Sequence, residues 1–291
     1  MINDFLDAIL ADFESYIQSG QDLCKLRDTH FDAGRIPDYS DINIQQLYLL
    51  RYAYAYAFEY KYMYQFLLKK LPPFQSLEVT SVGCGSMVDY WSLSRVVGES
   101  CTIDYRGIDT IEWFYQFPAR PWDSVEHYCE NAVDYFKQEE LSSDIYIFPK
   151  SISEFSLNEI SQIADCFSAD SIIKDKIHFL FSLRNDQGSM SRDAQKTQVL
   201  YNKLLDIGFR TSDVCNKYAH FGSDVYNKTI QSVDPDFQHP GAQIDCLRDL
   251  YSHCPKFSHC VEHQGCQDRL GRFPMLRCKY AAWQSFSFER E

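Results

Sequence analysis

The sequence predicts an α/β protein, in which a mostly parallel sheet is covered by helices on both faces and preceded by a helical segment. Three observations support this prediction. Apolar residues recur at helical spacing through residues 1–75. From Leu77 onward, short apolar runs of strand length alternate with helical segments. A glycine turn joins the first of these runs to the helix that follows it, as in βα units.

Composition limits the classes of protein to consider. The chain has 291 residues, 45% of them hydrophobic, and a formal net charge of −13, which argues against extended disorder and against non-specific binding to nucleic acid. No run of about 18 uncharged apolar residues is present, so we expect no transmembrane helix and no membrane partner. The first residues lack the basic region of a signal peptide. We therefore expect a cytoplasmic protein, in which the 11 cysteines are thiols or metal ligands.

Residues 1–75 are predicted to form a helical cover. Residues 2–18 carry one apolar face, and Gly20 ends that helix. A second helix is predicted over residues 41–70, before Pro72-Pro73. One aromatic row on it recurs every four residues: Tyr48, Tyr52, Tyr56, Tyr60 and Tyr64. We interpret this row, and a parallel row from Tyr54 to Phe66, as packing faces; the alternative is a surface that stacks on or covers a substrate.

Residues 76–291 are predicted to form the α/β domain. The expected strands are Leu77–Val82, Thr102–Ile108, a weaker one at Glu126–Tyr128, Asp144–Phe148 and Lys176–Leu183. The expected helices are 88–97, 130–141, 156–167 and 192–206. Two further segments alternate like strands: Phe209–Lys217, and Arg272–Phe288 as one strand or a hairpin.

The glycine turn is the best candidate for a ligand site. Residues 79–86 read VTSVGCGS, so a strand runs into Gly83-Cys84-Gly85-Ser86 and then into a helix. Glycines let the backbone turn sharply and approach a ligand without a Cβ atom in the way. The second strand ends at Asp109, and a carboxylate there can accept hydrogen bonds from both hydroxyls of a ribose. A tight turn without a ligand is the alternative.

This turn resembles the first motif of class I S-adenosylmethionine-dependent methyltransferases, and residues 107–109 (GID) are similar to their ribose-binding strand end. The resemblance covers about residues 77–217. It implies a Rossmann-like, seven-stranded sheet with an antiparallel last strand, and an enzyme that transfers a methyl group from S-adenosylmethionine to an acceptor that the sequence does not identify. It also places Thr110 and Phe148 in the cofactor site. Asn131 or Asp134 would meet the adenine ring, although either can equally cap a helix.

Two positions depart from the family pattern. Ser81 stands where an acidic residue is common, and Met87 where a further glycine is frequent. These departures motivate an alternative, a catalytically degenerate methyltransferase fold that binds or assembles an RNA or protein partner. A nicotinamide-dependent oxidoreductase is a weaker alternative, because a dinucleotide-binding turn needs a glycine or alanine at the position of Val88. Cys84 has no histidine near it in the sequence, and we interpret it as a small residue at a crowded turn.

The region after the fourth strand, residues 144–151 (DIYIFPKS), corresponds to the catalytic region of the family. It lacks the Pro-Pro-aromatic pattern of enzymes that methylate amino groups in nucleic acids. Lys150, Ser151 and Glu154 are expected at the carboxyl end of the sheet, and none stands out as a general base. Methyl transfer can need only the alignment of acceptor and sulfonium.

Residues 246–278 are expected to form a cysteine-rich insertion before the last strand. Four cysteines are the candidate ligands of zinc or an iron–sulfur cluster: Cys254, Cys260, Cys266 and Cys278. Whether Cys246 and three interleaved histidines take part is left open, and free thiols are the alternative.

The C-terminal segment also differs in charge from the rest of the chain. Residues 246–291 carry 7 Lys and Arg against 5 Asp and Glu, so they could contact phosphate locally. The order of the parts is loosely similar to ribosomal small-subunit-associated methyltransferase-like proteins, which implies RNA or a ribonucleoprotein as partner.

Overall fold

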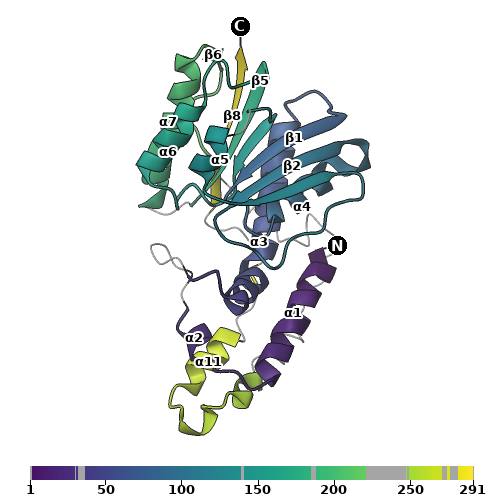
Figure 1. The fold of residues 1–291 in the computed structure, drawn as a ribbon, viewed down its shortest axis with the longest axis vertical. Coiled ribbons are helices and arrows are strands. Elements are labelled where there is room, and N and C mark those ends of the chain that lie inside the picture. The colour runs from purple at the N-terminus through teal and green to yellow at the C-terminus, as the bar shows by residue number, and fades with distance from the viewer. Residues whose placement is uncertain are drawn as a thin grey trace. The chain divides into compact units, whose positions relative to one another are not determined.

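The computed structural model describes residues 2–29, 31, 37–138, 141–184, 188–220, 247, 249–270, 274–275 and 281–290. The chain forms two compact units. The first unit comprises residues 1–58, 113–115 and 228–277, and the second comprises residues 59–112, 116–227 and 278–291. The second unit contains the sheet (Figure 1). Among the described residues, no helix is long and apolar enough to cross a membrane.

The sheet confirms the predicted Rossmann-like α/β fold. Its parallel strands are β1 (Ser76–Val82), β2 (Thr102–Asp109), β3 (Ser124–Cys129), β4 (Ile145–Phe148) and β5 (Lys176–Arg184). The last strand, β8 (Ala281–Arg290), is antiparallel to β5 and also pairs with the short strands β6 (Phe209–Arg210) and β7 (Ala219–His220). The order β3-β2-β1-β4-β5-β8-β6 gives a seven-stranded path with an antiparallel last strand, as the resemblance implied.

Helices cover both faces of this sheet. One layer consists of α5 (Ala132–Gln138), α6 (Leu157–Cys166) and α7 (Ser189–Asp206), on the left in Figure 1. The other face carries α4 (Val88–Val97) and residues 59–68 of the long helix α3 (Ile42–Leu68). Because helices cover both faces, the central strands are buried: β4 is buried at every residue and β5 is buried from Ile177 to Leu183.

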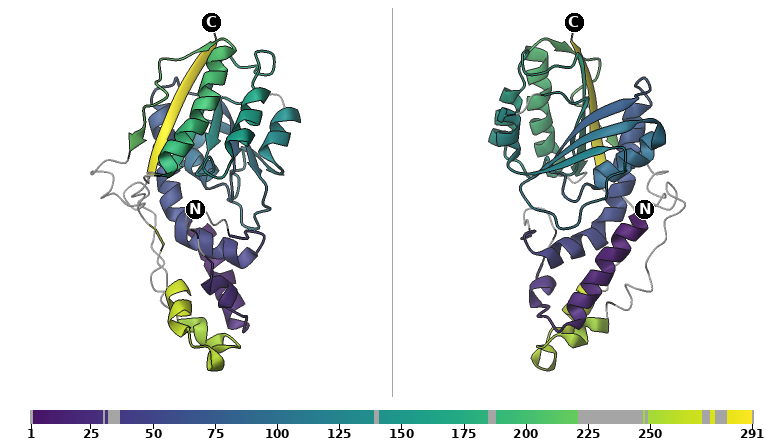
Figure 2. Two further views of the ribbon diagram at one scale, coloured as in Figure 1. Left: turned by 90° about the vertical axis from the view of Figure 1, so that its left-hand side faces the viewer. Right: turned by 45° about the vertical axis from the view of Figure 1, so that its right-hand side comes forward.

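Aromatic contacts fix the helices on the sheet. Figure 2 shows α7 beside β8, where the ring of Tyr201 lies 5.2 Å from that of Phe286. On the opposite face, Tyr62 and Phe66 of α3 pack edge-on against Trp283 of β8. The predicted packing role of the aromatic rows is confirmed for four residues that are almost fully buried: Tyr54, Phe58, Tyr60 and Tyr64.

The sixth strand is shorter than the sequence pattern indicated. Only Phe209 and Arg210 of the segment 209–217 pair with β8. The chain then turns, because the Thr211 hydroxyl accepts a hydrogen bond from the Asp213 backbone N–H at 3.0 Å. The Asp213 carboxylate in turn accepts the N–H of Ser287 at 2.8 Å. Such side-chain bonds to the backbone compete with strand pairing, which explains the early end of β6.

The first unit is helical, and its labelled helices in Figure 1 are α1 (Ile2–Gln18), α2 (Cys24–Arg27) and α11 (His263–Leu270). Two short 3-10 helices, Leu250–His253 and Phe257–His259, precede α11. Helix α1 buries the predicted apolar face, including Ile2, Ile9, Phe13 and Ile17. Residues 42–58 of α3 belong to this unit, where Tyr52 and Tyr56 stack with ring centroids 5.7 Å apart.

Helix α6 begins with a capping box, which gives a stability prediction. The Ser156 hydroxyl accepts the Glu159 N–H at 3.2 Å, and the Glu159 carboxylate accepts the Ser156 N–H at 2.7 Å. We expect Ser156→Ala to lower the free energy of unfolding by about 1 kcal/mol in urea denaturation. Ser161→Ala, inside the same helix, is the control and should be near neutral. A loss no larger than that of the control would contradict the capping role.

Candidate functional site

The glycine turn joins β1 to α4. It packs between the end of β2 and the loop after β4. Gly83 and Gly85 both have positive φ angles, 71° and 55°. The N–H groups of Gly83 and Cys84 donate to the carbonyl oxygen of Ile108 on β2, at 2.7 and 3.1 Å. A Cβ atom at Gly83 would lie 2.3 Å from the Cβ atom of Ser151, in the loop after β4. Only glycine therefore fits at position 83 without displacing that loop.

The structure brings the glycine turn and Asp109 together. One carboxylate oxygen of Asp109 accepts the Gly85 N–H at 2.9 Å, and the other accepts the Ile111 N–H at 2.9 Å. The side chain is partly exposed, and a carboxylate has about four acceptor sites. Two parts of the site that were predicted from separate strands therefore lie side by side, and two backbone N–H groups orient the carboxylate.

Cys84 and Ser86, the other two residues of the predicted turn, are both buried. Burial raises the pKa of the Cys84 thiol well above its ordinary value, and the negative charges of Asp109 and Asp89 add to this effect. Cys84 is therefore a protonated, buried thiol, which agrees with its interpretation as a small residue at a crowded turn. Its Sγ atom would lie 2.8 Å from a Cβ atom at Gly107, so that glycine lets β2 approach the turn.

The other four predicted cofactor residues differ from one another in exposure and in hydrogen-bond partners. Thr110 is exposed directly after Asp109. Asn131 caps α5, since its side-chain oxygen accepts the Val133 N–H at 2.8 Å. Asp134 is exposed on α5 and lies 3.8 Å from Lys137. Phe148 is 1% exposed in the core under α6. The adenine contact of Asn131 or Asp134 stays a prediction.

The sequence did not point to Asp89, a buried acidic residue next to the turn. Asp89, in the first turn of α4, is fully buried, and both of its carboxylate oxygens accept the Tyr105 hydroxyl, at 3.0 and 3.1 Å. Burial raises the pKa of Asp89 to about 6. No spacing in the sequence marked this residue, because an aspartate in a first helical turn is ordinarily exposed.

This shifted pKa predicts a pH-dependent stability. Above about pH 6 the folded state carries a buried charge that the unfolded chain holds in water, so Asp89 destabilises the fold there. We expect Asp89→Asn to raise the free energy of unfolding at about pH 8 by on the order of 2 kcal/mol. The gain should shrink as the pH falls through 6 and vanish below about 4. Urea denaturation at several pH values measures it, and a gain independent of pH would contradict the assignment.

The loop after β4 carries the three residues expected at the carboxyl end of the sheet. Lys150 has a positive φ of 60°, unusual for a residue with a side chain. Its ammonium group lies 2.7 Å from the carboxylate of Glu59 and donates to the Leu183 carbonyl at 2.9 Å. The Ser151 hydroxyl donates to the Val82 carbonyl oxygen. Glu154 is exposed at the end of this loop.

The structure gives no support to the predicted metal site. Cys254 and Cys266 are buried, whereas Cys246 and Cys278 lie outside the described residues. Among the residues that are described, no group of three His, Cys, Asp or Glu side chains could hold a metal ion. Cys254 follows one 3-10 helix, Cys260 follows the next, and Cys266 is in α11, so the spacing distributes the thiols over three elements. The two buried cysteines pack as small apolar side chains.

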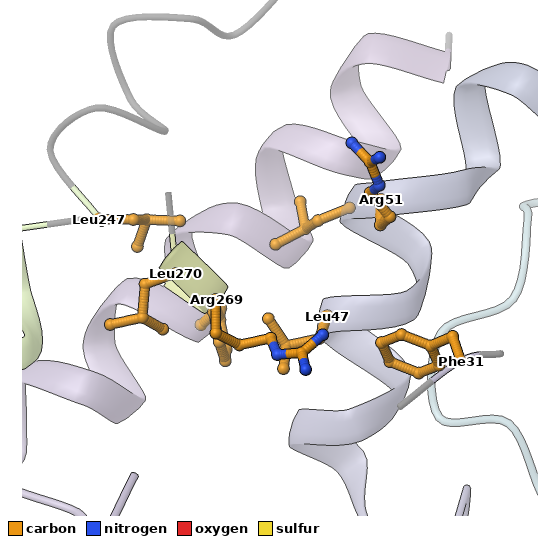
Figure 3. Close-up of a pocket in the computed structure, with 8 residues that line it drawn as sticks. Phe31, Leu47, Arg51, Leu247, Arg269 and Leu270 are labelled. Carbon is orange, nitrogen blue, oxygen red and sulfur yellow. The ribbon is translucent and has the colours of Figure 1, made fainter. Parts of the chain in front are cut away.

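A pocket lies within the first unit. It is mostly apolar, with two arginines among its lining residues, of which Figure 3 labels six. The lining residues are Phe13, Phe31, Leu47, Leu50, Arg51, Leu247, Arg269 and Leu270. Arg269 also donates to the Arg27 carbonyl at 3.2 Å, so this guanidinium takes part in holding α11 on α2.

Comparison with known proteins finds similarity only at the level of solved structures. No protein-family model matches the sequence, and no curated protein matches it significantly. A SAM-dependent methyltransferase from Archaeoglobus fulgidus is 13% identical, with 79% of this chain and 94% of that chain covered and a TM-score of 0.38. One from Aquifex aeolicus is 14% identical, with 52% and 81% covered and a TM-score of 0.33.

A third similar structure is the plantazolicin methyltransferase BpumL in complex with SAH. It is 10% identical to this chain, with 97% of this chain and 99% of that chain covered and a TM-score of 0.37. At such identities and TM-scores, these likenesses establish neither a family nor an activity. The strand order and the contacts around Asp109 carry the functional inference.

Proposed function

We propose that the protein is an S-adenosylmethionine-dependent methyltransferase. The observation that carries this proposal is the hydrogen bond between the Gly85 N–H and the Asp109 carboxylate, which joins the glycine turn after β1 to the acid at the end of β2. Both lie at the carboxyl ends of parallel strands, next to the point where the strand order reverses between β1 and β4. In open α/β sheets, ligands bind at this place.

In this function, Asp109, the glycine turn and the loop after β4 would have separate roles. The carboxylate of Asp109, oriented by the N–H groups of Gly85 and Ile111, would accept the two ribose hydroxyls. The turn at Gly83 and Gly85 lets the backbone approach the methionine part of the cofactor, as the family resemblance implies. When bound, the cofactor supplies an activated methyl group on a sulfonium. The loop at Lys150 and Ser151 adjoins the turn and would form the wall on which an acceptor is aligned.

The start of α4 favours this cofactor over a dinucleotide. Val88, the first residue of the helix, is 7% exposed. A dinucleotide-binding turn needs a glycine or alanine there for close packing of helix on strand. The branched side chain of Val88 does not allow that close packing.

Calorimetry with S-adenosylmethionine and S-adenosylhomocysteine tests the proposal. We expect both to bind the folded protein in the micromolar range. Gly85→Asp, which adds a side chain and a negative charge at the turn, should abolish binding. Absence of binding by folded wild-type protein at high micromolar ligand would refute the proposal. It would then favour the binding or assembly module with an RNA or protein partner.

A further inference from the structure

The loop between β4 and α6 is fixed at four successive residues. Lys150 is held by Glu59 and by the Leu183 carbonyl, and Ser151 by the Val82 carbonyl. The ammonium group of Lys196, on α7, donates to the carbonyl oxygens of Ile152 and Ser153 at 2.9 and 3.2 Å. Contacts to β1, β5, α3 and α7 therefore determine the course of this loop. A loop held in this way presents the residue that follows it in a defined position.

That next residue is Glu154. Its backbone N–H donates to the Ser151 carbonyl at 2.8 Å, so the main chain is fixed here as well. Its side chain is exposed, and the carboxylate forms no hydrogen bond or ion pair with any residue that the structure describes. Glu59 and Glu159, which flank the loop on α3 and α6, are both occupied by structural partners. A carboxylate without such a role, on a backbone that is held in place, is available to a ligand.

The charged groups that act on Glu154 are Asp109 and Arg184. Although the residue is exposed, the surrounding protein reduces its hydration and raises the pKa of its carboxyl to about 7. The negative charge of Asp109 contributes in the same direction, and Arg184 at the end of β5 opposes it. A carboxylate that titrates near neutral pH is well matched to accept a proton during a reaction and to release it afterwards.

We infer that Glu154 is the proton acceptor of the methyl-transfer step, and that the acceptor atom is a nitrogen or oxygen that still carries a hydrogen. This inference rests on the proposed function. As the bond from the acceptor atom to the methyl carbon forms, the carbon–sulfur bond breaks and its electron pair stays on sulfur. The hydrogen of the acceptor leaves as a proton to the Glu154 carboxylate, which passes it to solvent.

The other ionisable groups near the turn are less suited to this role. Asp89 is fully buried under α4, where an acceptor cannot reach it. Asp109 is engaged by Gly85 and Ile111, and the proposed function assigns its carboxylate to the ribose. Lys150 is held by the Glu59 carboxylate and the Leu183 carbonyl oxygen. Of these four residues, only Glu154 has an exposed side chain whose carboxylate has no hydrogen-bond partner among the described residues.

Carbon-13 NMR of protein labelled at the glutamate carboxyl carbons tests the titration directly. Glu154→Gln assigns the resonance by its loss. The matched control is Glu159→Gln, five residues further on, which keeps the helix cap because glutamine also serves in a capping box. We expect Glu154 to titrate near pH 7 in the wild type. Titration near the ordinary value of 4.5 would overturn the inference.

Binding measurements test whether Glu154 lies next to the reacting sulfur. S-adenosylmethionine carries a positive sulfonium and S-adenosylhomocysteine a neutral thioether, so their affinity ratio reports the local negative charge. Between about pH 5.5 and pH 8 we expect this ratio to rise roughly three- to tenfold in the wild type and in Glu159→Gln. It should stay constant in Glu154→Gln.

The outcomes separate this inference from the function on which it rests. If the wild type binds neither compound at any pH, the proposed function fails. If both compounds bind but the ratio changes with pH equally in Glu154→Gln and in the wild type, only the role of Glu154 is overturned. A shifted titration together with a pH-dependent ratio that Glu154→Gln removes supports the inference.

Discussion

Replacing Asp109 with alanine is expected to weaken the binding of S-adenosylmethionine by about 3 kcal/mol, which is a factor of about 100. Hydrogen bonds to a charged group each contribute about 1.5–3 kcal/mol, and the variant loses those to the ribose hydroxyls. It also releases the N–H groups of Gly85 and Ile111, which the carboxylate holds at 2.9 Å. The glycine turn then loses its link to the end of β2.

Isothermal titration calorimetry measures this effect. Asp104→Ala is the matched control, because Asp104 lies on the same strand near its other end, where it pairs with Arg106 at 3.5 Å. The control should bind as the wild type does. Thermal unfolding of both variants checks that the sheet is intact. Binding by Asp109→Ala within threefold of the wild type would show that the carboxylate does not contact the cofactor.

The glycine turn and Asp109 could be predicted because they depend on local chain geometry. A strand followed by Gly-x-Gly and a helix specifies where the turn lies, and parallel pairing of β1 with β2 brings the end of the second strand to it. The departure at Met87 also has a structural meaning. Met87 has a φ of 61°, so the chain keeps at this position the left-handed conformation that a glycine adopts without strain. The sequence shows that methionine stands in place of the glycine. Only the structure shows that Met87 keeps the left-handed backbone conformation.

The sequence placed Glu154 at the carboxyl end of the sheet but did not reveal its raised pKa, and it did not mark Asp89 at all, because these properties come from the surroundings of the two side chains. Glu154 is one of many acidic residues in a chain of net charge −13, and its neighbours Asp109 and Arg184 belong to other strands. Asp89 is distinguished only by its burial against Tyr105. The cysteine-rich segment shows the opposite case. Its unusual composition predicted a metal site, which the described part of the segment does not support.

The second large effect is expected at the ion pair of Glu59 and Lys150. Glu59 is 1% exposed and Lys150 12% exposed, with 2.7 Å between them, and Glu59 also accepts the Ser182 hydroxyl. Breaking a buried pair by removing one partner leaves an uncompensated charge, which costs about 3–5 kcal/mol. We expect Glu59→Gln and Lys150→Met each to lower the free energy of unfolding by about this amount in urea denaturation. For comparison, Glu289→Gln breaks an exposed pair with Lys176 and should cost less than about 1 kcal/mol.

The double variant decides whether the two charges act as a pair. Once both are neutral no buried charge is left, so the combined loss should be smaller than the sum of the single losses by about 2 kcal/mol or more. Additive losses would mean that the charges are stabilised separately, Glu59 by Ser182 and Lys150 by the Leu183 carbonyl. The left-handed backbone at Lys150 makes this distinction relevant to the site. A strained residue persists where surrounding contacts over-determine it, and this pair is the strongest such contact next to the glycine turn.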